Sequence, residues 1–197
     1  PETDGVPFSD LTALDQLMVA RLTQVQAEGD AAYAGYEFNR AYRVLYDFVV
    51  TELSNVYLDA LKDRLYCEKP GSLARRSAQT VLAELLSMLL RDLQPILAFT
   101  CDEVMAYAPA GCRGGETYAA MLDWYQAPIS VEEANEYSEV LTAALTLRGA
   151  VTKALEDART AGTFTKSQEV RISATVPSSD FALLTGERGI DLAEFFI

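Results

Sequence analysis

Seven basic side chains fall within one short stretch of this sequence, residues 36–81, where only six acidic residues accompany them. On both sides of that stretch acids outnumber bases, and the whole chain has a net charge of −13. Proteins bind phosphate with clustered Lys and Arg, and Arg adds a bidentate fork. If this protein binds an anion, we expect it there. The basic residues of the stretch are Arg40, Arg43, Lys62, Arg64, Lys69, Arg75 and Arg76.

Tyrosines are interleaved with these basic residues, at Tyr42, Tyr46, Tyr57 and Tyr66. Unpaired RNA bases are recognised by stacking on aromatic rings or guanidinium planes. Helical spacing favours the core, however, for Tyr42, Tyr46 and Tyr57. Two of the basic residues also have an alternative to binding RNA. Arg64 beside Asp63 and Lys62 near Asp59 can form ion pairs.

The composition argues against a catalytic or metal site in this chain. There is no histidine, which removes the commonest general base and the commonest metal ligand. The three cysteines are odd in number and no two have C-x-x-C spacing, so neither a disulfide framework nor a Cys-rich zinc site is indicated. We therefore predict no catalytic residue, no metal ligand and no bound cofactor.

No apolar stretch is long enough and free enough of charge to cross a membrane, and the start has no signal-peptide pattern. These features and the free cysteines favour a cytoplasmic protein that contacts neither membrane nor DNA. The chain lacks an initiator Met and ends on apolar residues, so we expect a piece of a longer protein.

Periodicity predicts that helices position these residues. Apolar spacing of three and four predicts helices over about 9–28, around 42–49, over 57–65 and over 73–93, the last being the most apolar and expected to be central. Thr100 and Ser130 begin capping boxes, and the second opens a long helix to about 161. Residues 109–130, rich in Gly and Pro, are expected to form an ordered strap over the helices.

Beyond Gly162 the period changes to two, with alternation over 170–176, and a second strand is expected over 192–197. The predicted fold is therefore mainly α: a helical bundle followed by a small α/β appendage. We divide the chain into residues 1–130, the bundle with its strap, and residues 131–197, the long helix and the appendage, truncated at the C-terminus.

Three blocks in order resemble the anticodon-binding helical domain of the class I tRNA synthetases, in particular the bacterial isoleucyl enzymes. They are Tyr57-Leu58-Asp59 with Lys62-Asp63-Arg64-Leu65-Tyr66, then Ser72 to Thr80, then Pro95 to Val104. Asp123-Trp124-Tyr125 and the segment from Leu147 to Lys153 are also similar to that family. Met105 departs from it, because the family commonly has Trp there.

The resemblance implies a region that binds the anticodon stem-loop of the isoleucine tRNA, through the seven basic residues named above. The parent enzyme would attach isoleucine to its tRNA with ATP and Mg²⁺. The family's ATP-binding signatures are absent here, so this part is expected to be non-catalytic and to depend on the missing catalytic domain of the same chain.

Two alternatives stay open at this point. The first is the same domain of the valyl, leucyl or methionyl enzyme. The second is a non-catalytic acidic helical module that binds other proteins.

Overall fold

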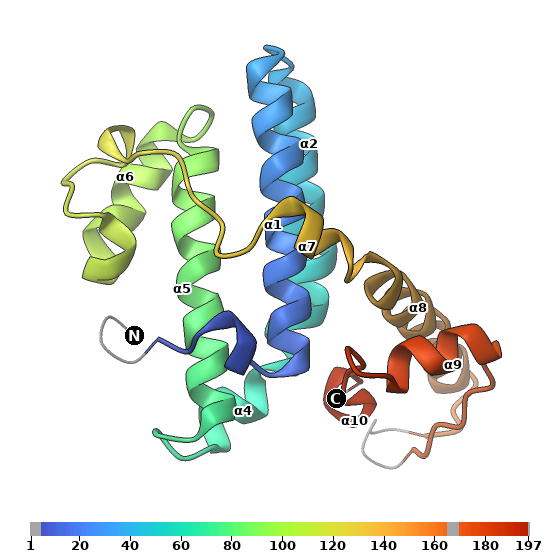
Figure 1. Ribbon diagram of the computed structural model, residues 1–197. Helices are drawn as coiled ribbons and strands as arrows, with labels where there is room; N and C mark the ends of the chain where they lie inside the picture. Colours follow the sequence, from blue (N-terminus) through green and yellow to red (C-terminus); the bar gives the residue numbers. More distant parts are fainter. Residues whose placement is uncertain (1–4, 165–169, 197) are drawn as a thin grey trace.

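The computed structural model describes residues 5–164 and 170–196, and within these ranges the chain is helical and contains no strand (Figure 1). The long helices are α1 (Ala13–Ala34), α2 (Phe38–Asp47), α5 (Leu73–Leu93), α6 (Ala98–Tyr107) and α8 (Ser138–Thr160). The shorter ones are η1 (Phe8–Asp10), the π-helical η2 (Phe48–Tyr57), α3 (Leu58–Ala60), α4 (Lys62–Cys67), η3 (Ala110–Arg113), η4 (Ala119–Met121), α7 (Val131–Asn135), α9 (Ser178–Thr185) and α10 (Leu192–Phe195).

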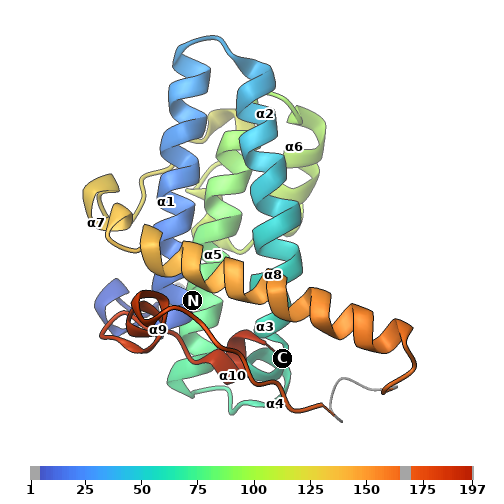
Figure 2. The same ribbon diagram turned by 90° about the vertical axis from the view of Figure 1, so that its right-hand side faces the viewer.

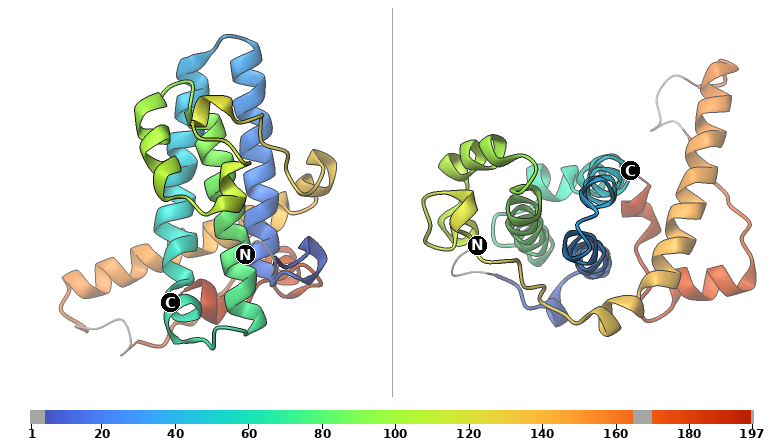
Figure 3. Two further views of the ribbon diagram at one scale, coloured as in Figure 1. Left: turned by 90° about the vertical axis from the view of Figure 1, so that its left-hand side faces the viewer. Right: turned by 90° about the horizontal axis from the view of Figure 1, so that it is seen from above.

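The bundle is built around α1. The chain turns back after α1 into α2 and continues through η2, α3 and α4, and α5 then returns beside them (Figures 1 and 3). Helix α1 packs against α2, α5 and α7, and buried residues lie on all its sides. The prediction that the helix over 73–93 is central is confirmed, because α5 contributes to both core clusters and contacts α1, α4 and α6. It is not the most buried helix, however: Leu82, Leu86 and Leu89 of α5 are only half-buried, and α1 has more buried residues.

Local sequence signals located several helix ends. Ser72 accepts a hydrogen bond from the backbone N–H of Arg75, and Ser130 accepts one from that of Glu133, so both are N-caps. Thr100 is not a cap, because α6 already begins at Ala98. The helix predicted over about 9–28 ends too early, because α1 continues through the buried Gly29 and Ala32 to Ala34.

The strap over residues 109–130 is confirmed as ordered and largely without regular structure, and it passes across α5 and α1 (Figure 1). Arg91 of α5 donates to the backbone carbonyl of Asp123 at 2.9 Å, and Gln26 of α1 donates to that of Tyr125 at 2.5 Å. The Tyr125 hydroxyl in turn donates to Glu84 at 2.5 Å. These hydrogen bonds fix the strap to two helices of the bundle.

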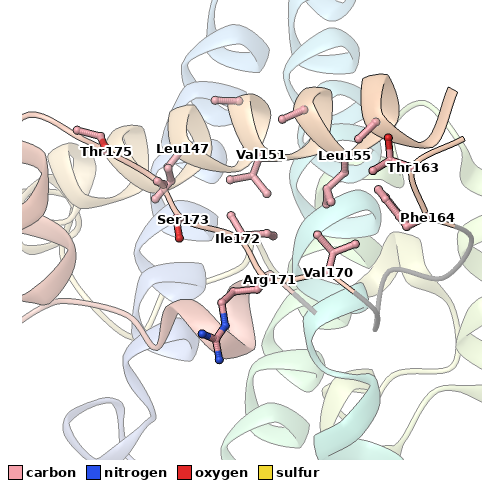
Figure 4. Close-up of a pocket in the computed structure, with 14 residues that line it drawn as sticks. Leu147, Val151, Leu155, Thr163, Phe164, Val170, Arg171, Ile172, Ser173 and Thr175 are labelled. Carbon is pink, nitrogen blue, oxygen red and sulfur yellow. The ribbon is translucent and has the colours of Figure 1, made fainter. Parts of the chain in front are cut away.

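The predicted α/β appendage is wrong in its strands. Residues 170–177 are extended but pair with no strand among the described residues, and 192–195 form α10; residues 165–169 and 197 lie outside the described residues. The period-two pattern has a different cause. Val170 and Ile172 face Val151 and Leu155 of α8 across a cavity of about 610 Å³, while Arg171 points away (Figure 4). The alternating apolar side chains thus line a cavity beside a helix instead of forming one face of a sheet.

Helix α8 crosses the bundle at a steep angle (Figure 2). Arg148 of α8 lies 3.5 Å from a carboxylate oxygen of Asp59 and donates to the backbone carbonyl of Asn55 at 3.1 Å. A second ion pair joins Arg64 of α4 to Glu194 of α10. Charge pairs therefore attach the C-terminal helices to the lower part of the bundle.

A buried carboxylate, Asp15, holds the helices of the bundle together. Its oxygens accept hydrogen bonds from the Tyr57 hydroxyl at 2.6 Å, from Arg64 Nη1 at 2.8 Å, and from Ser77. The side chain is fully buried, and its partners come from η2, α4 and α5. A buried charge is tolerated only when it is paired and hydrogen-bonded, so this arrangement fixes the relative positions of four segments.

Replacing Asp15 by Ala should lower the free energy of unfolding by about 3–5 kcal/mol, because the buried Arg64 loses one carboxylate partner and the hydroxyls of Thr12, Tyr57 and Ser77 lose their acceptor. Urea unfolding at neutral pH measures this loss. Asp10→Ala is the matched control, since Asp10 is exposed and should change stability by less than about 0.5 kcal/mol. Equal effects of the two substitutions would contradict the assignment.

Candidate nucleic-acid interface

The seven basic residues do not gather on one surface. Arg40 and Arg43 lie on α2 beside the α1–α2 turn, whereas the other five lie on α4, on the first turn of α5 or between them, at the opposite end of the bundle (Figure 1). About twenty helical residues separate Arg43 from Arg64, which corresponds to roughly 30 Å at 1.5 Å per residue. The sequence correctly placed the basic residues on successive helices. Those helices run end to end, however, so the residues are spread along the bundle.

Arg64 is the clearest departure from the expected site. Its side chain is 8% exposed and forms ion pairs with Asp15 and Glu194. The sequence left an ion pair open as an alternative, but its expected partner was Asp63, whereas the observed partners are Asp15 and Glu194. The guanidinium is therefore not presented to a ligand.

The other four basic residues at the α4–α5 end are at least partly accessible. Lys62 is exposed and lies 2.6 Å from Asp59, a surface pair that contributes little to stability. Lys69 is exposed in the loop before α5, and Arg75 is half-buried, with Nη1 on the backbone carbonyl of Glu68 at 3.1 Å. Arg76 is half-buried on the same turn.

Acidic groups weaken the positive potential at that end. A cavity of about 450 Å³ between α4 and α10 contains the carboxylates of Asp63, Glu68, Asp191 and Glu194 in its lining, around the paired Arg64. Because both signs of charge meet here, this end of the bundle is a mixed surface and not a cationic one.

The α1–α2 end presents exposed aromatic rings beside two arginines. We call this group the tip surface, and it consists of Tyr36, Phe38, Arg40, Tyr42, Arg43, Tyr46 and Trp124. The exposed fractions of the aromatic residues run from 45% for Tyr42 to 82% for Tyr36. The rings form two contact groups: Tyr36 contacts Phe38, and Tyr33 contacts both Phe38 and Trp124. The Tyr42 and Tyr46 rings stack on each other with centroids 5.5 Å apart.

The two arginines of the tip surface are accessible. Arg43 is exposed and makes no ion pair with any described residue, and Arg40 pairs with the exposed Glu37 at 3.0 Å. A surface pair of this kind is readily exchanged for another anionic partner.

Tyr36 lies at a strained backbone position. Its φ of 58° is left-handed, which glycine adopts freely and a tyrosine only at a cost. The N–H of Tyr36 bonds to the carbonyl of Tyr33, and that of Glu37 bonds to the carbonyl of Ala32, so the turn is a Schellman motif with Tyr where Gly is usual. The strain holds an aromatic ring in solvent, which is a reason to consider it functional.

Sequence reasoning missed most of this surface. It correctly predicted Tyr57 in the core but wrongly placed Tyr42 and Tyr46 there, since the buried stripe of α2 and η2 is Ala41, Leu45 and Phe48. Two apolar stripes of helical spacing compete on α2, and only the packing decides between them. The dipeptide Gly35-Tyr36 marks a turn, but no sequence signal places Trp124 against Tyr33 of α1.

Tyr36→Gly should raise the free energy of unfolding by about 1 kcal/mol, because it removes the left-handed strain. Tyr66→Gly is the matched control: Tyr66 is also 82% exposed but lies in α4, where Gly should lower stability by about 0.5–1 kcal/mol. Thermal or urea unfolding gives both values. A loss of stability in Tyr36→Gly would refute the strain argument.

The described residues contain no helix with the length and apolarity that a membrane span requires, and no cluster of three potential metal ligands. The cavity beside α8 has a single charged residue, Arg171, in the lining that the structure describes. The tip surface is therefore the best-formed candidate interface in this part of the chain.

Comparison with known proteins identifies a family to which this chain is similar. Residues 15–174 match the family described as "Anticodon-binding domain of tRNA ligase". The isoleucine–tRNA ligase of Chromohalobacter salexigens is 42% identical over 163 residues, which cover 82% of this chain and 17% of that protein. The isoleucine–tRNA ligases of Desulfovibrio desulfuricans and Thermotoga petrophila are 39% and 37% identical, over 86% and 100% of the chain and over 19% and 21% of their own lengths.

The chain thus spans about a fifth of the length of these relatives. The family match, in contrast, extends from the early part of α1 to the extended segment beyond α8, which is most of the chain. On that match, this protein belongs to the family of anticodon-binding domains of tRNA ligases.

Proposed function

We propose that this chain is the anticodon-binding domain of an isoleucine–tRNA ligase and that its tip surface receives the unpaired bases of the anticodon loop. The observation that carries the proposal is the group of exposed rings beside Arg40 and Arg43 at one end of a domain of this family. Anticodon bases can be splayed out, and every base offers a face for stacking. The isoleucine assignment is supported by similarity to an isoleucine–tRNA ligase over the whole of this chain, which is 21% of that relative's length.

The α4–α5 end would have a different task. Lys62, Lys69, Arg75 and Arg76 lie too far from the tip to touch the same few nucleotides, so we assign them to phosphates elsewhere on the tRNA. Phosphate contacts fix the position of the RNA, whereas contacts with bases select its sequence. This division keeps six of the seven predicted residues as proposed contacts and leaves out Arg64.

The rest of the reaction would belong to other parts of the enzyme. In this proposal the full ligase works in the cytoplasm and uses ATP and Mg²⁺ to activate isoleucine. This chain contains neither of the family's ATP-binding signatures. Its contribution is to position and select the tRNA.

Anticodon variants test the isoleucine assignment. Hairpin RNAs with the isoleucine anticodon should bind the chain more tightly than hairpins of the same stem with valine, leucine or methionine anticodons, measured by fluorescence anisotropy. Affinity should be micromolar or weaker, because the net charge of −13 repels RNA. Equal affinity for all four hairpins would exclude anticodon selection, and nanomolar binding would contradict the electrostatic argument.

Salt dependence separates the two proposed contact regions. Tyr36→Gly should weaken RNA binding by about 1–3 kcal/mol without changing the dependence of affinity on salt, because stacking releases no counterion. Changing Arg75 and Arg76 together to Ala should flatten that dependence by up to about 2 in slope, because two phosphate contacts are lost. Tyr66→Gly should change neither quantity. If Tyr36→Gly binds as the parent chain does, the tip surface is not the site.

A protein partner is the second candidate, and one observation favours it. Tyr42, Tyr46 and Val50 form an exposed apolar stripe along α2 and η2, the kind of face that accepts a helix. Apolar docking of that type should hardly respond to salt, whereas RNA binding should weaken steeply as salt increases. The same titration therefore distinguishes the two functions.

A further inference from the structure

Asp92 of α5 is a fully buried carboxylate that the proposed RNA contacts do not use. Neither of its side-chain oxygens has a hydrogen-bond partner among the described residues. Burial, and then the nearby charge of Asp30, raise the pKa of this carboxyl to about 7, while Arg91 acts in the opposite direction. The group therefore changes its charge near neutral pH, where carboxylates are ordinarily ionised.

Titratable groups from several elements surround Asp92. Asp30 and Tyr33 face it from α1, Arg91 is next to it on α5, and Tyr125 approaches from the strap. Cys101 of α6 lies near Tyr33. Arg91 donates to the backbone carbonyls of Ser87 at 2.8 Å and Asp123 at 2.9 Å, so its guanidinium is engaged with main chain and not with the carboxylate.

Tyr33 connects Asp92 to the tip surface. Its hydroxyl donates to the backbone carbonyl of Asp92 at 2.5 Å. Its ring contacts Phe38 and Trp124, with centroids 6.0 and 5.6 Å away. Burial, with the charges of Asp92, Cys101 and Asp30, raises the pKa of Tyr33 to about 12, so the hydroxyl keeps its proton at neutral pH. A change in the charge of Asp92 can thus reach Phe38 and Trp124 of the tip surface through Tyr33, which is hydrogen-bonded to Asp92 and in ring contact with both.

We propose that Asp92 is a positioning residue for the tip surface and acts through Tyr33. In the protonated state the Tyr33 hydroxyl rests on the Asp92 carbonyl, and the ring supports Phe38 and Trp124 as observed. Loss of the proton draws the hydroxyl to the carboxylate and shifts the ring. The physical reason is that a buried neutral carboxyl tolerates a missing partner far better than a buried charge does.

The single tryptophan of the chain is a built-in reporter of this switch. Trp124 contacts Tyr33, and the absence of histidine leaves few other groups to titrate between pH 5 and 8. Trp124 emission of the 197-residue chain should show one transition with a midpoint near pH 7. A flat emission profile would overturn the proposal.

Three variants assign the transition. Asp92→Asn mimics the neutral carboxyl and should abolish the transition, with emission held at the low-pH value. Tyr33→Phe should also abolish it, because the moving hydroxyl is gone, and this variant keeps the test valid if Asp92→Asn does not fold. Asp30→Asn should move the midpoint to lower pH, since the carboxylate of Asp30 disfavours charge on Asp92.

Asp63→Asn is the control, because Asp63 is exposed on α4 at the opposite end of the bundle and should leave the midpoint unchanged. A transition that persists in Asp92→Asn and in Tyr33→Phe would contradict the inference.

The consequence for RNA rests on the proposed function and has its own readout. Hairpin affinity of the parent chain should change between pH 6 and 8, and the affinity of Asp92→Asn should not. If the emission transition is present but no RNA binds, the switch stands and the proposed function fails. If RNA binds and the emission of all variants is flat, the function stands and the switch fails.

Discussion

The hydrogen bonds to Asp15 are the constraint on which this architecture depends. A carboxylate with no solvent exposure needs donors from the protein, and it receives them from η2, α4 and α5. Those three segments must therefore meet beside the first turn of α1. Arg64 extends the constraint to α10 through Glu194. The two ion pairs Asp15–Arg64 and Arg64–Glu194 therefore connect the bundle with the C-terminal helices.

The end of the bundle that lies away from this network is the one to which we assign the recognition of RNA bases. The α1–α2 turn projects beyond the charge network, and its left-handed Tyr36 and the rings of Phe38 and Trp124 are not needed to bury the core. In the proposed function, the stacking of RNA bases is therefore separated from the Asp15 network, whereas the phosphate contacts of Lys62, Lys69, Arg75 and Arg76 lie at the same end as that network. Under the proposed function, a chain with a net charge of −13 would still hold RNA bases at the tip surface, because stacking does not depend on net charge.

The sequence predicted what depends on local signals. The Ser72 and Ser130 caps, the ordered strap and the burial of Tyr57 follow from spacing and side-chain chemistry that neighbours in the chain supply. The family likeness was also visible, because three blocks stand in order along the chain.

What depends on distant partners could not be predicted. Arg64 appears in the sequence as one more surface base, and its partner Asp15 is 49 positions away. Alternation over 170–176 correctly indicated one apolar face, but only the position of α8 shows that this face lines a cavity beside a helix. The tip surface likewise needs Trp124 to reach α1, a contact between residues 91 positions apart in the chain.

The most direct test of the central claim is the emission of Trp124 when an anticodon hairpin is added, with RNA binding followed separately through a label on the RNA. If unpaired bases stack on the tip surface, the emission should be quenched in parallel with binding. Saturated binding that leaves the emission of this single tryptophan unchanged would show that the RNA docks elsewhere on the domain.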